Sequence, residues 1–487
     1  ICGWGSHLIG RKAIPGFERE DISRVLYDYL SGQTGWLTKM EATKDFTTLL
    51  GNIKSTKKKE LWSYSVNYVE DMLRNSDKVD RIVDNMKAAV FIHFLGFNPK
   101  TAAVNLTQNI IVGVPMLHMD VKGPAVGYWK AALNTLGKQV FTRAKFLSGR
   151  GLSEDEARML NELYMEDVTT EGYLRDIRGR IGSRSSQMFG KVMRAAGYFM
   201  EVAERFNRAS LALAAYRAAK SSKLTDATQK RIGVSGPATH NQAKAYAAAL
   251  VKDAHYVYGK DNMPEPLRHS QAGRALSPIY TFRAFSHNYI SGLLYAIKSR
   301  GAAGWGMAAR SIGAMIVLGG LTSIPFYASV MALCQVGSGD DDDWTDLVRK
   351  ALPDSDWLRD VVCYGLPSLA GVYLGGSLRI ETPLERGIKP GATPKDIMTD
   401  SLGSVIGIPY SGVEIASRMI EAKRGGDPWR VLEEAAPIAL KNAMAAYRLS
   451  TEGQTTLKGR PLMDGSEPRK LTAGEAVGKA LGFQPVS

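Results

Sequence analysis

The chain has 487 residues, and its 45% hydrophobic and 23% charged content excludes a wholly disordered polypeptide. At roughly 150 residues per domain, this length predicts two to four packed units. The formal net charge of +14 favours anionic partners, such as nucleic acid, acidic lipid headgroups or acidic proteins.

The N-terminal segment, residues 1–94, is expected to be helical and to continue a longer or processed polypeptide. It opens with "ICGWGSHLIG", without an initiator methionine or a signal-peptide layout. The basic stretch "KSTKKKE" lies in this segment, and a second basic stretch follows between Arg175 and Arg194. Both could hold phosphates of DNA or of lipid headgroups, and a solvated helix face explains them equally well. The candidate contact residues are Lys54, Lys57, Lys58, Lys59, Arg175, Arg178, Arg180 and Arg184.

A helical domain is predicted over residues 95–235. Its clearest element is an amphipathic helix over 192–220, in which apolar residues recur at alternating spacings of three and four. On the other faces of this helix, Glu201 and Glu204 precede Arg205 and Arg208 by four residues, the favourable order for ion pairs. The residues expected to pack against neighbouring helices are Phe199, Phe206, Leu213 and Tyr216.

The next predicted helical domain, 236–340, contains an apolar hairpin over 311–339. This run has 29 residues without a charge, and 361–378 has 18 more, whereas a bilayer crossing needs roughly 20. Glycine or proline breaks both runs, which favours burial among other helices and leaves membrane insertion at a later stage open. The candidates for membrane contact or helix packing are Gly319, Gly320, Pro325, Phe326, Gly371 and Gly375.

A third uncharged run, 101–119, contains three side-chain amides that would be costly in lipid unless they are paired. These amides belong to Asn105, Gln108 and Asn109. The run is therefore treated with the other two as a helix that packs inside the protein.

The C-terminal part is predicted as a Gly- and Pro-broken helical region over 341–450 and an arm with a short helix over 451–487. Capping boxes at Ser153–Glu156 and Thr472–Glu475 mark two helix starts. Breaks are expected near 148–153, 231–240, 337–343 and 383–394. Because alternating strand patterns are nearly absent, the predicted fold is all-α: an elongated multi-helix assembly with several broken apolar helices and an extended C-terminal arm.

Motifs of catalysis and metal binding are missing from the sequence. The seven histidines have no metal-ligand spacing, and His93 and His118 have the apolar neighbours typical of core or interface positions. The three cysteines indicate neither a disulfide framework nor a metal site, and Asp340–Asp343 lacks the spacing of a calcium loop. The chain is therefore expected not to be an enzyme and to use no cofactor, metal ion or small-molecule substrate.

Six blocks of sequence stand out between residues 95 and 485. They are "LGFNPKTAAVNLTQN" (95–109), "EVAERFNRASLALAAY" (201–216), "SPIYTFRAFSHNYI" (277–290), "GLPSLAGVYLGGSL" (365–378), "PIALKNAMAAYRLSTEG" (437–453) and "LTAGEAVGKALGFQP" (471–485). Their order resembles the C-terminal helical region of large polyvalent proteins, which are giant polypeptides of bacteriophages and related mobile elements. These motifs are structural, so the resemblance implies no active-site residue.

The resemblance implies a structural role in a virion. In short-tailed bacteriophages, comparable long basic helical proteins are internal virion, or ejection, proteins. Such a protein lies in the capsid interior near the portal, leaves with the genome and helps to form a conduit for DNA across the host cell envelope. The expected partners are further copies of the chain, other ejection and portal-core proteins, phage DNA bound without sequence specificity, and the host membrane.

Two other functions fit the same residues. The chain could be a non-catalytic scaffold or docking module of a giant polyvalent protein whose enzymatic domains lie outside it. It could also be a bacterial integral membrane protein, which a mean hydropathy of -0.15 disfavours.

Overall fold

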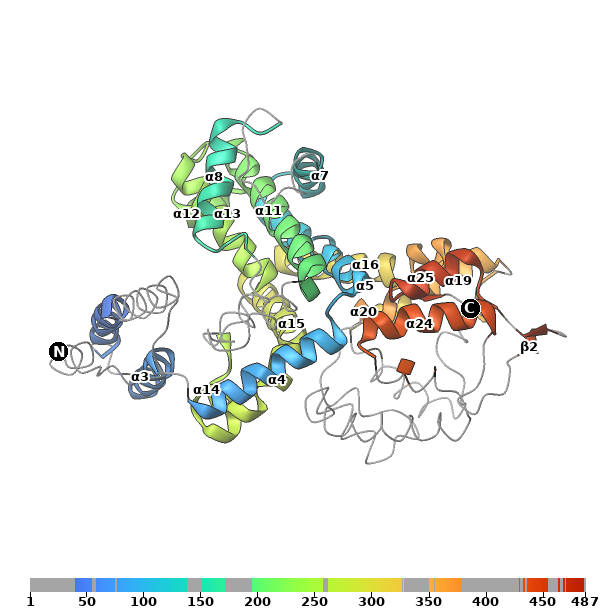
Figure 1. The fold of residues 1–487 in the computed structure, drawn as a ribbon. Helices are drawn as coiled ribbons and strands as arrows, with labels where there is room; N and C mark the ends of the chain where they lie inside the picture. Colours follow the sequence, from blue (N-terminus) through green and yellow to red (C-terminus); the bar gives the residue numbers. More distant parts are fainter. Residues whose placement is uncertain are drawn as a thin grey trace. The chain divides into compact units, whose positions relative to one another are not determined.

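Helices dominate the described parts of the chain and confirm the predicted all-α class (Figure 1). Two compact units divide the chain, Ile1–Asp77 and Lys78–Ser487. The structure is a computed structural model that describes residues 40–54, 58–74, 77–137, 151–170, 195–256, 262–325, 327, 350–353, 355–378, 429, 432–433, 436–453, 463–464, 467–468 and 470–485.

In the first unit, the described residues form a helix over 40–54 and the helix α3 (Lys59–Leu73). Along α3, the rings of Tyr64 and Tyr68 lie one turn apart, with 6.4 Å between their centroids. The predicted helical character of this segment is therefore confirmed where it is described.

The second unit begins with a series of short helices that lead into its core. They are α4 (Lys78–Phe94), α5 (Pro99–Leu106), the π-helical turn η1 (Asn109–Gly113), α6 (Val114–Asp120), α7 (Ala125–Leu136) and α8 (Glu154–Met165). The Ser153 hydroxyl accepts from the Glu156 amide at the start of α8, and the Glu156 carboxylate accepts from the Ser153 amide. The capping box predicted there is confirmed.

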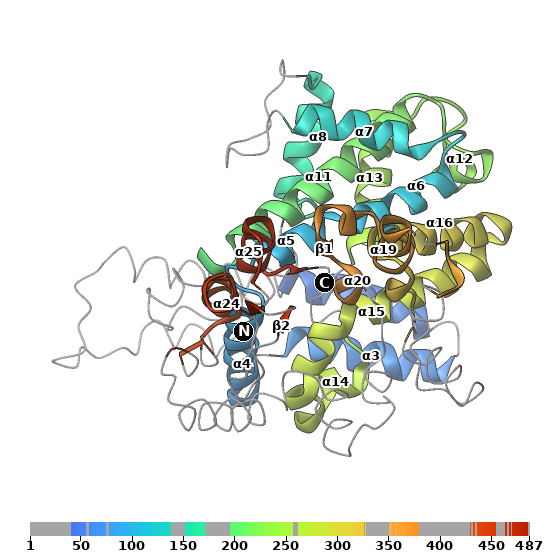
Figure 2. The ribbon, with the colours of Figure 1, turned by 90° about the vertical axis from the view of Figure 1, so that its right-hand side faces the viewer.

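The central helix of this unit is α11 (Tyr198–Lys220), which packs against α5, α7 and the helix α13 (His240–His255) (Figure 2). The short helix α12 (Asp226–Ile232) lies between them in the chain and ends at Gly233, within the break predicted near 231–240. From Ala203 onwards α11 is buried on nearly all sides, so it is a core helix and not the one-sided amphipathic helix that its spacing predicts.

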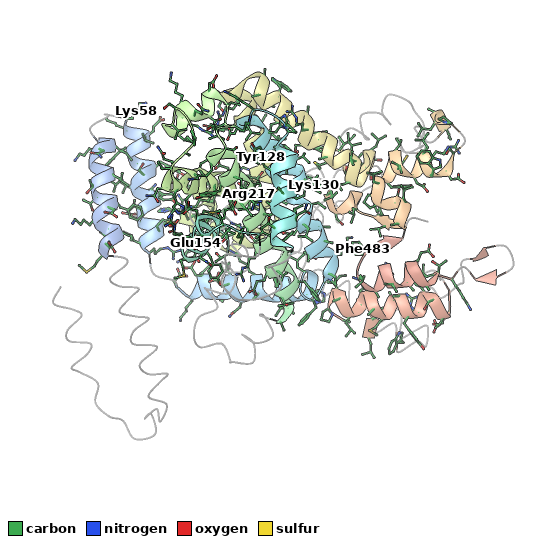
Figure 3. The ribbon with its side chains drawn as sticks, turned by 90° about the horizontal axis from the view of Figure 1, so that it is seen from above. Lys58, Tyr128, Lys130, Glu154, Arg217 and Phe483 are labelled. Carbon is green, nitrogen blue, oxygen red and sulfur yellow. The ribbon has the colours of Figure 1, made fainter. Side chains whose placement is uncertain are left out.

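Hydrogen bonds between polar side chains join α11 to its neighbours. The Arg217 guanidinium donates to Glu156 Oε1 over 2.7 Å and to Thr135 Oγ1 over 3.3 Å, which joins α11 to α8 and α7. The Tyr128 and Ser221 hydroxyls are 3.0 Å apart on the same side of α11. Figure 3 labels Arg217 and Tyr128. Burial is the largest single influence on Glu156 and would raise its pKa, but hydrogen bonds from Arg217 and Ser153 and the Arg217 charge hold this pKa below its usual value.

Two long helices follow, α15 (Gln271–Arg300) and α16 (Ala302–Gly319), after the short α14 (Glu265–His269). Gly301 joins them with φ 53°, a conformation that favours glycine. The apolar run predicted over 311–339 therefore begins inside a helix that starts at Ala302 and includes Arg310. The helix ends at Gly320, and a 3₁₀ turn, η3 (Leu321–Ser323), follows.

The C-terminal part of the second unit packs back onto earlier helices. Its first elements are α19 (Asp356–Tyr364), η4 (Leu366–Ala370), β1 (Val372–Tyr373) and α20 (Gly375–Leu378). A hairpin of α24 (Ile438–Thr451) and α25 (Ala473–Ala480) follows, and both helices lie side by side in Figures 1 and 2. The capping box predicted at Thr472 is confirmed at the start of α25.

Two very short strand pairs complete the described fold. Antiparallel β1 pairs with β4 (Gln484–Pro485), with Val372 opposite Pro485, and β2 (Met463–Asp464) pairs with β3 (Glu467–Pro468). The C-terminal segment predicted as an extended arm is thus tied to the middle of the chain by β4. Several sequence predictions fall outside the described residues: Lys57, Arg175, Arg178, Arg180, Arg184, Phe326, the second half of the apolar hairpin, and the breaks near 337–343 and 383–394.

Candidate functional site

Glycines of the two uncharged runs meet where α16 ends. A Cβ atom on Gly319 would lie 2.9 Å from Gly375 Cα, and one on Gly365 would lie 2.6 Å from the Gly319 backbone nitrogen. Gly320 has φ +67°, and a Cβ there would overlap the backbone carbonyl of Cys363. This glycine junction, Gly319, Gly320, Gly365 and Gly375, lets the backbones of α16, α19 and α20 touch without intervening side chains.

Hydroxyl groups next to the glycine junction complete its packing. Thr322 Oγ1 donates to the carbonyls of Gly319 over 2.9 Å and Cys363 over 3.3 Å, while Ser323 Oγ donates to the Met315 carbonyl over 2.7 Å. The bond to Gly319 pairs a carbonyl at the end of α16 that has no partner within the helix, and the bond to Cys363 joins this end to α19. Of the other candidates, Pro325 follows η3, whereas Gly371 lies in a turn with φ +70° and open space around it.

The exposed side of α16 carries large apolar side chains and one charged residue. Trp305 is 64% exposed and Val317 is 51% exposed, and Arg310 is the single charged residue of the helix. Within the described chain, α16 is also the one helix whose length and composition would allow it to cross a membrane, and 33% of it is buried. Its 18 residues correspond to about 27 Å, close to the thickness of the hydrocarbon core of a bilayer.

Neighbouring elements add further exposed apolar side chains. Leu294 and Tyr295 are exposed near the end of α15, and Trp357 is exposed on α19. Leu366 and Leu369 are exposed on η4, which contacts α16. We call this set of exposed residues the α16 surface: Leu294, Tyr295, Trp305, Val317, Trp357, Leu366 and Leu369. These residues lie on α16 and on the three elements α15, α19 and η4 that pack against it.

Beneath α11, the π-helical turn brings buried polar side chains together. Asn109 Nδ2 donates to the Asn207 carbonyl over 2.8 Å and to Ser210 Oγ over 3.1 Å. His255 Nε2 donates to Asn109 Oδ1 over 2.9 Å, and the buried Nδ1 atom of His255 has no hydrogen-bond partner among the described residues. Complete burial, aided by the nearby Arg208 charge, holds the pKa of His255 well below its usual value, so this imidazole is neutral.

An ion pair that the sequence places on an outer face of α11 is buried instead. Arg208 Nη2 lies 2.9 Å from Glu204 Oε1, and both side chains are only 4% exposed. Arg208 also donates to the Val168 carbonyl over 3.3 Å. Spacing alone gave no signal of this burial, because four-residue spacing is equally typical of solvated faces. The pair and the asparagine network belong to the buried core.

The four residues expected to pack on α11 differ in burial. Leu213 and Tyr216 are buried and Phe206 is partly buried, as expected for packing positions. Phe199, in contrast, is 45% exposed in the first turn of the helix and contacts the neighbouring Tyr198 ring. The packed part of the helix therefore begins after its first turn.

The described lysines of the first basic stretch lie at two helix ends of the first unit. Lys54 is in the last turn of the 40–54 helix and lies over the Trp62 ring, 5.7 Å from its centroid. Lys58 immediately precedes α3, where Figure 3 labels it, and Lys59 is the first residue of α3. All three are exposed and are able to contact an anionic surface.

In the part of the chain that the structure describes, no group of three or more His, Cys, Asp or Glu residues is placed to hold a metal ion. Comparison with known proteins gave no match to a family model, to a curated protein or to a solved structure.

Proposed function

We propose that this chain is a non-catalytic structural protein of a bacteriophage virion that contacts a lipid bilayer through the α16 surface. It lies in the capsid interior near the portal, is released with the genome and helps to form a conduit for DNA across the host envelope. The observation that carries the proposal is the exposed apolar face of α16, with Trp305 and Val317 in water on a helix that has a single charge.

The chemistry of the α16 surface suits the boundary between lipid and water. Tryptophan and tyrosine favour that boundary because they combine an apolar ring with one polar group, and Trp305, Trp357 and Tyr295 supply three such rings. Lys298 and Arg310 are exposed on the two helices of this surface and would pair with anionic headgroups. Burying the apolar side chains in lipid would release roughly 25 cal/mol for each Å² removed from water.

The inner face of α16 favours contact with the membrane over crossing it in this conformation. The Ser311 and Tyr289 hydroxyls are 2.7 Å apart between α16 and α15, and both are buried. The glycine junction ties the end of α16 to α19 and α20. Crossing would require these contacts to separate, whereas surface contact leaves them intact.

The basic excess of the chain supports the second half of the proposal, contact with phage DNA. The exposed Lys54, Lys58 and Lys59 supply positive charge at adjacent helix ends of the first unit, and phosphates would be held there without sequence specificity. Other copies of the chain and other ejection or portal-core proteins are the proposed protein partners.

The experiment that tests this function locates the chain before and after infection. Purified virions and membrane fractions of infected cells are analysed by quantitative mass spectrometry for peptides of α15 and α16. The proposal expects the chain in virions and, after genome release, in the envelope fraction. Absence from virions, or retention in emptied capsids, would contradict it.

A further inference from the structure

The corner between α15 and α16 carries exposed aromatic rings and basic side chains. Tyr295 lies in the last two turns of α15 and Trp305 in the first turn of α16, and both are exposed. Lys298 is exposed as well, and Arg300, the last residue of α15, is partly exposed. We call these four residues the α15–α16 corner: Tyr295, Lys298, Arg300 and Trp305.

Close packing of the two helices fixes the shape of this corner. A Cβ atom on Gly304 would overlap the carbonyl of Ala296, so the backbone of α16 folds back directly against that of α15. Gly301, which joins the helices, has nothing within 4 Å of an added Cβ. The exposed side chains of the corner are therefore carried by two packed helices at a tight turn.

The charges of α15 and α16 are all positive. The sequence has no acidic residue between Glu265 and Asp340, whereas α15 and α16 together contain five basic residues. Lys298 has no ionic partner among the described residues. A surface with charge of one sign attracts partners of the opposite sign, so the corner is suited to an anionic partner.

One carboxylate reaches the corner from another helix. Asp120, the last residue of α6, has a side chain that is only 4% exposed, and its Oδ1 atom lies 3.5 Å from Arg300 Nη2. This is the one ion pair of Arg300 in the described chain, and its guanidinium makes no hydrogen bond there. The N–H donors of Arg300 can therefore serve a further acceptor, such as the oxygens of a phosphate.

Asp120 has other partners that compensate its charge. Its Oδ2 atom accepts from Arg231 Nη2 over 2.8 Å and from the Tyr246 hydroxyl over 3.2 Å, and its Oδ1 atom accepts from the Thr228 hydroxyl over 2.8 Å. Removing the sole cation from a buried carboxylate is costly, but Asp120 keeps a cation and these hydrogen bonds when Arg300 leaves. A partly exposed ion pair contributes little, so a stronger acceptor can take the Arg300 guanidinium.

We propose that Arg300 is the residue through which the α15–α16 corner recognises an anionic lipid, and that Asp120 is the internal acceptor from which the lipid phosphate takes it. This inference rests on the proposed contact between the α16 surface and a bilayer. Arginine can hold a phosphate through two parallel hydrogen bonds, which its contact with Asp120 does not supply. Tyr295 and Trp305 precede and follow Arg300 in the chain, and such rings favour a lipid headgroup over a DNA phosphate.

The test measures binding of the full chain to vesicles of phosphatidylcholine alone and of phosphatidylcholine mixed with phosphatidylglycerol. Arg300→Met removes the charge and keeps an aliphatic chain, and Arg158→Met, which removes an exposed arginine ion pair on α8, is the control. Arg300→Met is expected to bind the mixed vesicles about fivefold more weakly than the wild type and the control, the factor that one basic residue contributes near an anionic surface. Binding to phosphatidylcholine alone should be the same in all three proteins.

Asp120→Asn tests the role of the internal acceptor. Because it weakens the hold on Arg300, this variant should bind the mixed vesicles up to about fivefold more tightly than the wild type. The gain should vanish in the Asp120→Asn, Arg300→Met double variant, and a gain that persists there would overturn the role of Asp120.

Arg231→Met replaces Asp120→Asn if that variant does not fold. It leaves Arg300 as the sole cation beside Asp120, so Arg300 should be held more tightly and binding to the mixed vesicles should fall towards that of Arg300→Met. Unchanged binding of Arg231→Met would overturn the role of Asp120.

The remaining outcomes separate this inference from the proposed function. Equal binding of the wild type and Arg300→Met to the mixed vesicles would overturn the inference and leave membrane contact standing. No binding of the wild type to either kind of vesicle would overturn membrane contact itself. Weaker binding of Arg300→Met to double-stranded DNA, with unchanged binding to vesicles, would assign Arg300 to DNA and overturn its assignment to lipid.

Discussion

Substitution of Gly320 by alanine should open the glycine junction. Gly320 has φ +67°, and a Cβ there would overlap the backbone of Cys363 and Tyr364, which cannot move as a flexible side chain can. Gly301 is the closer control because its backbone, at φ 53° and ψ -123°, also lies outside the left-handed helical region, and nothing lies within 4 Å of an added Cβ. Both substitutions strain the backbone, but only Gly320→Ala forces α16 and α19 apart.

The difference between the two variants in the free energy of opening the junction follows from these contacts. A sparsely populated conformation with positive φ costs a non-glycine residue about 1–3 kcal/mol, and both variants bear a cost of this kind. Overpacking adds about 1–3 kcal/mol for Gly320→Ala alone. Since 1.4 kcal/mol is a factor of ten, the junction should open roughly 5- to 150-fold more often in Gly320→Ala than in Gly301→Ala.

The Cys363 thiol reports this opening directly, because it is completely buried beside Gly320. Its alkylation rate is followed by mass spectrometry of the peptide that contains it, at reagent concentrations where labelling is slower than reclosing. Equal alkylation rates in the two variants would refute the packing role assigned to the glycine junction and would favour membrane contact for these glycines.

Two further predictions concern the core around α11. Arg208→Met should destabilise the second unit by about 3–5 kcal/mol in urea unfolding, because it leaves Glu204 charged and buried. The Glu204→Leu, Arg208→Met double variant should recover most of this loss. A surface control, Arg158→Met, should change the free energy of unfolding by at most about 1 kcal/mol. Since the native pKa of His255 lies well below 6.5, its contribution to stability is complete above that pH and declines as pH falls from 7 to 5, by at most about 1.4 kcal/mol per pH unit. His255→Gln keeps a donor for Asn109, and its free energy of unfolding should depend less on pH over that range. The same pH dependence in the wild type and the variant would contradict the assignment of His255 as neutral. Comparing the two proteins cancels the contributions of His93 and His118.

Local sequence rules located several features of the fold correctly. The two capping boxes at Ser153 and Thr472 depend on residues three positions apart, so the sequence contains all the information they need. The same holds for the end of α12 at Gly233. The cost of the amides in the 101–119 run also indicated that they need partners, which Asn207, Ser210 and the Ala254 carbonyl provide.

Features that depend on distant segments could not be predicted. Burial of Glu204 and Arg208 follows from α5, α7 and α13 surrounding α11, and helical spacing contains no information about that enclosure. The glycines of the two apolar runs were recognised, but that they meet each other is a property of the tertiary fold.

The central claim, contact between the α16 surface and a lipid bilayer, is tested most directly by vesicle flotation of two matched variants. Val317→Asp places a charge on the exposed face of α16, and Val477→Asp places the same charge at a 61% exposed position of α25. The wild type and Val477→Asp are expected to float with vesicles of anionic lipid, while Val317→Asp stays in the soluble fraction. Equal flotation of both variants, or no flotation of the wild type, would contradict the account.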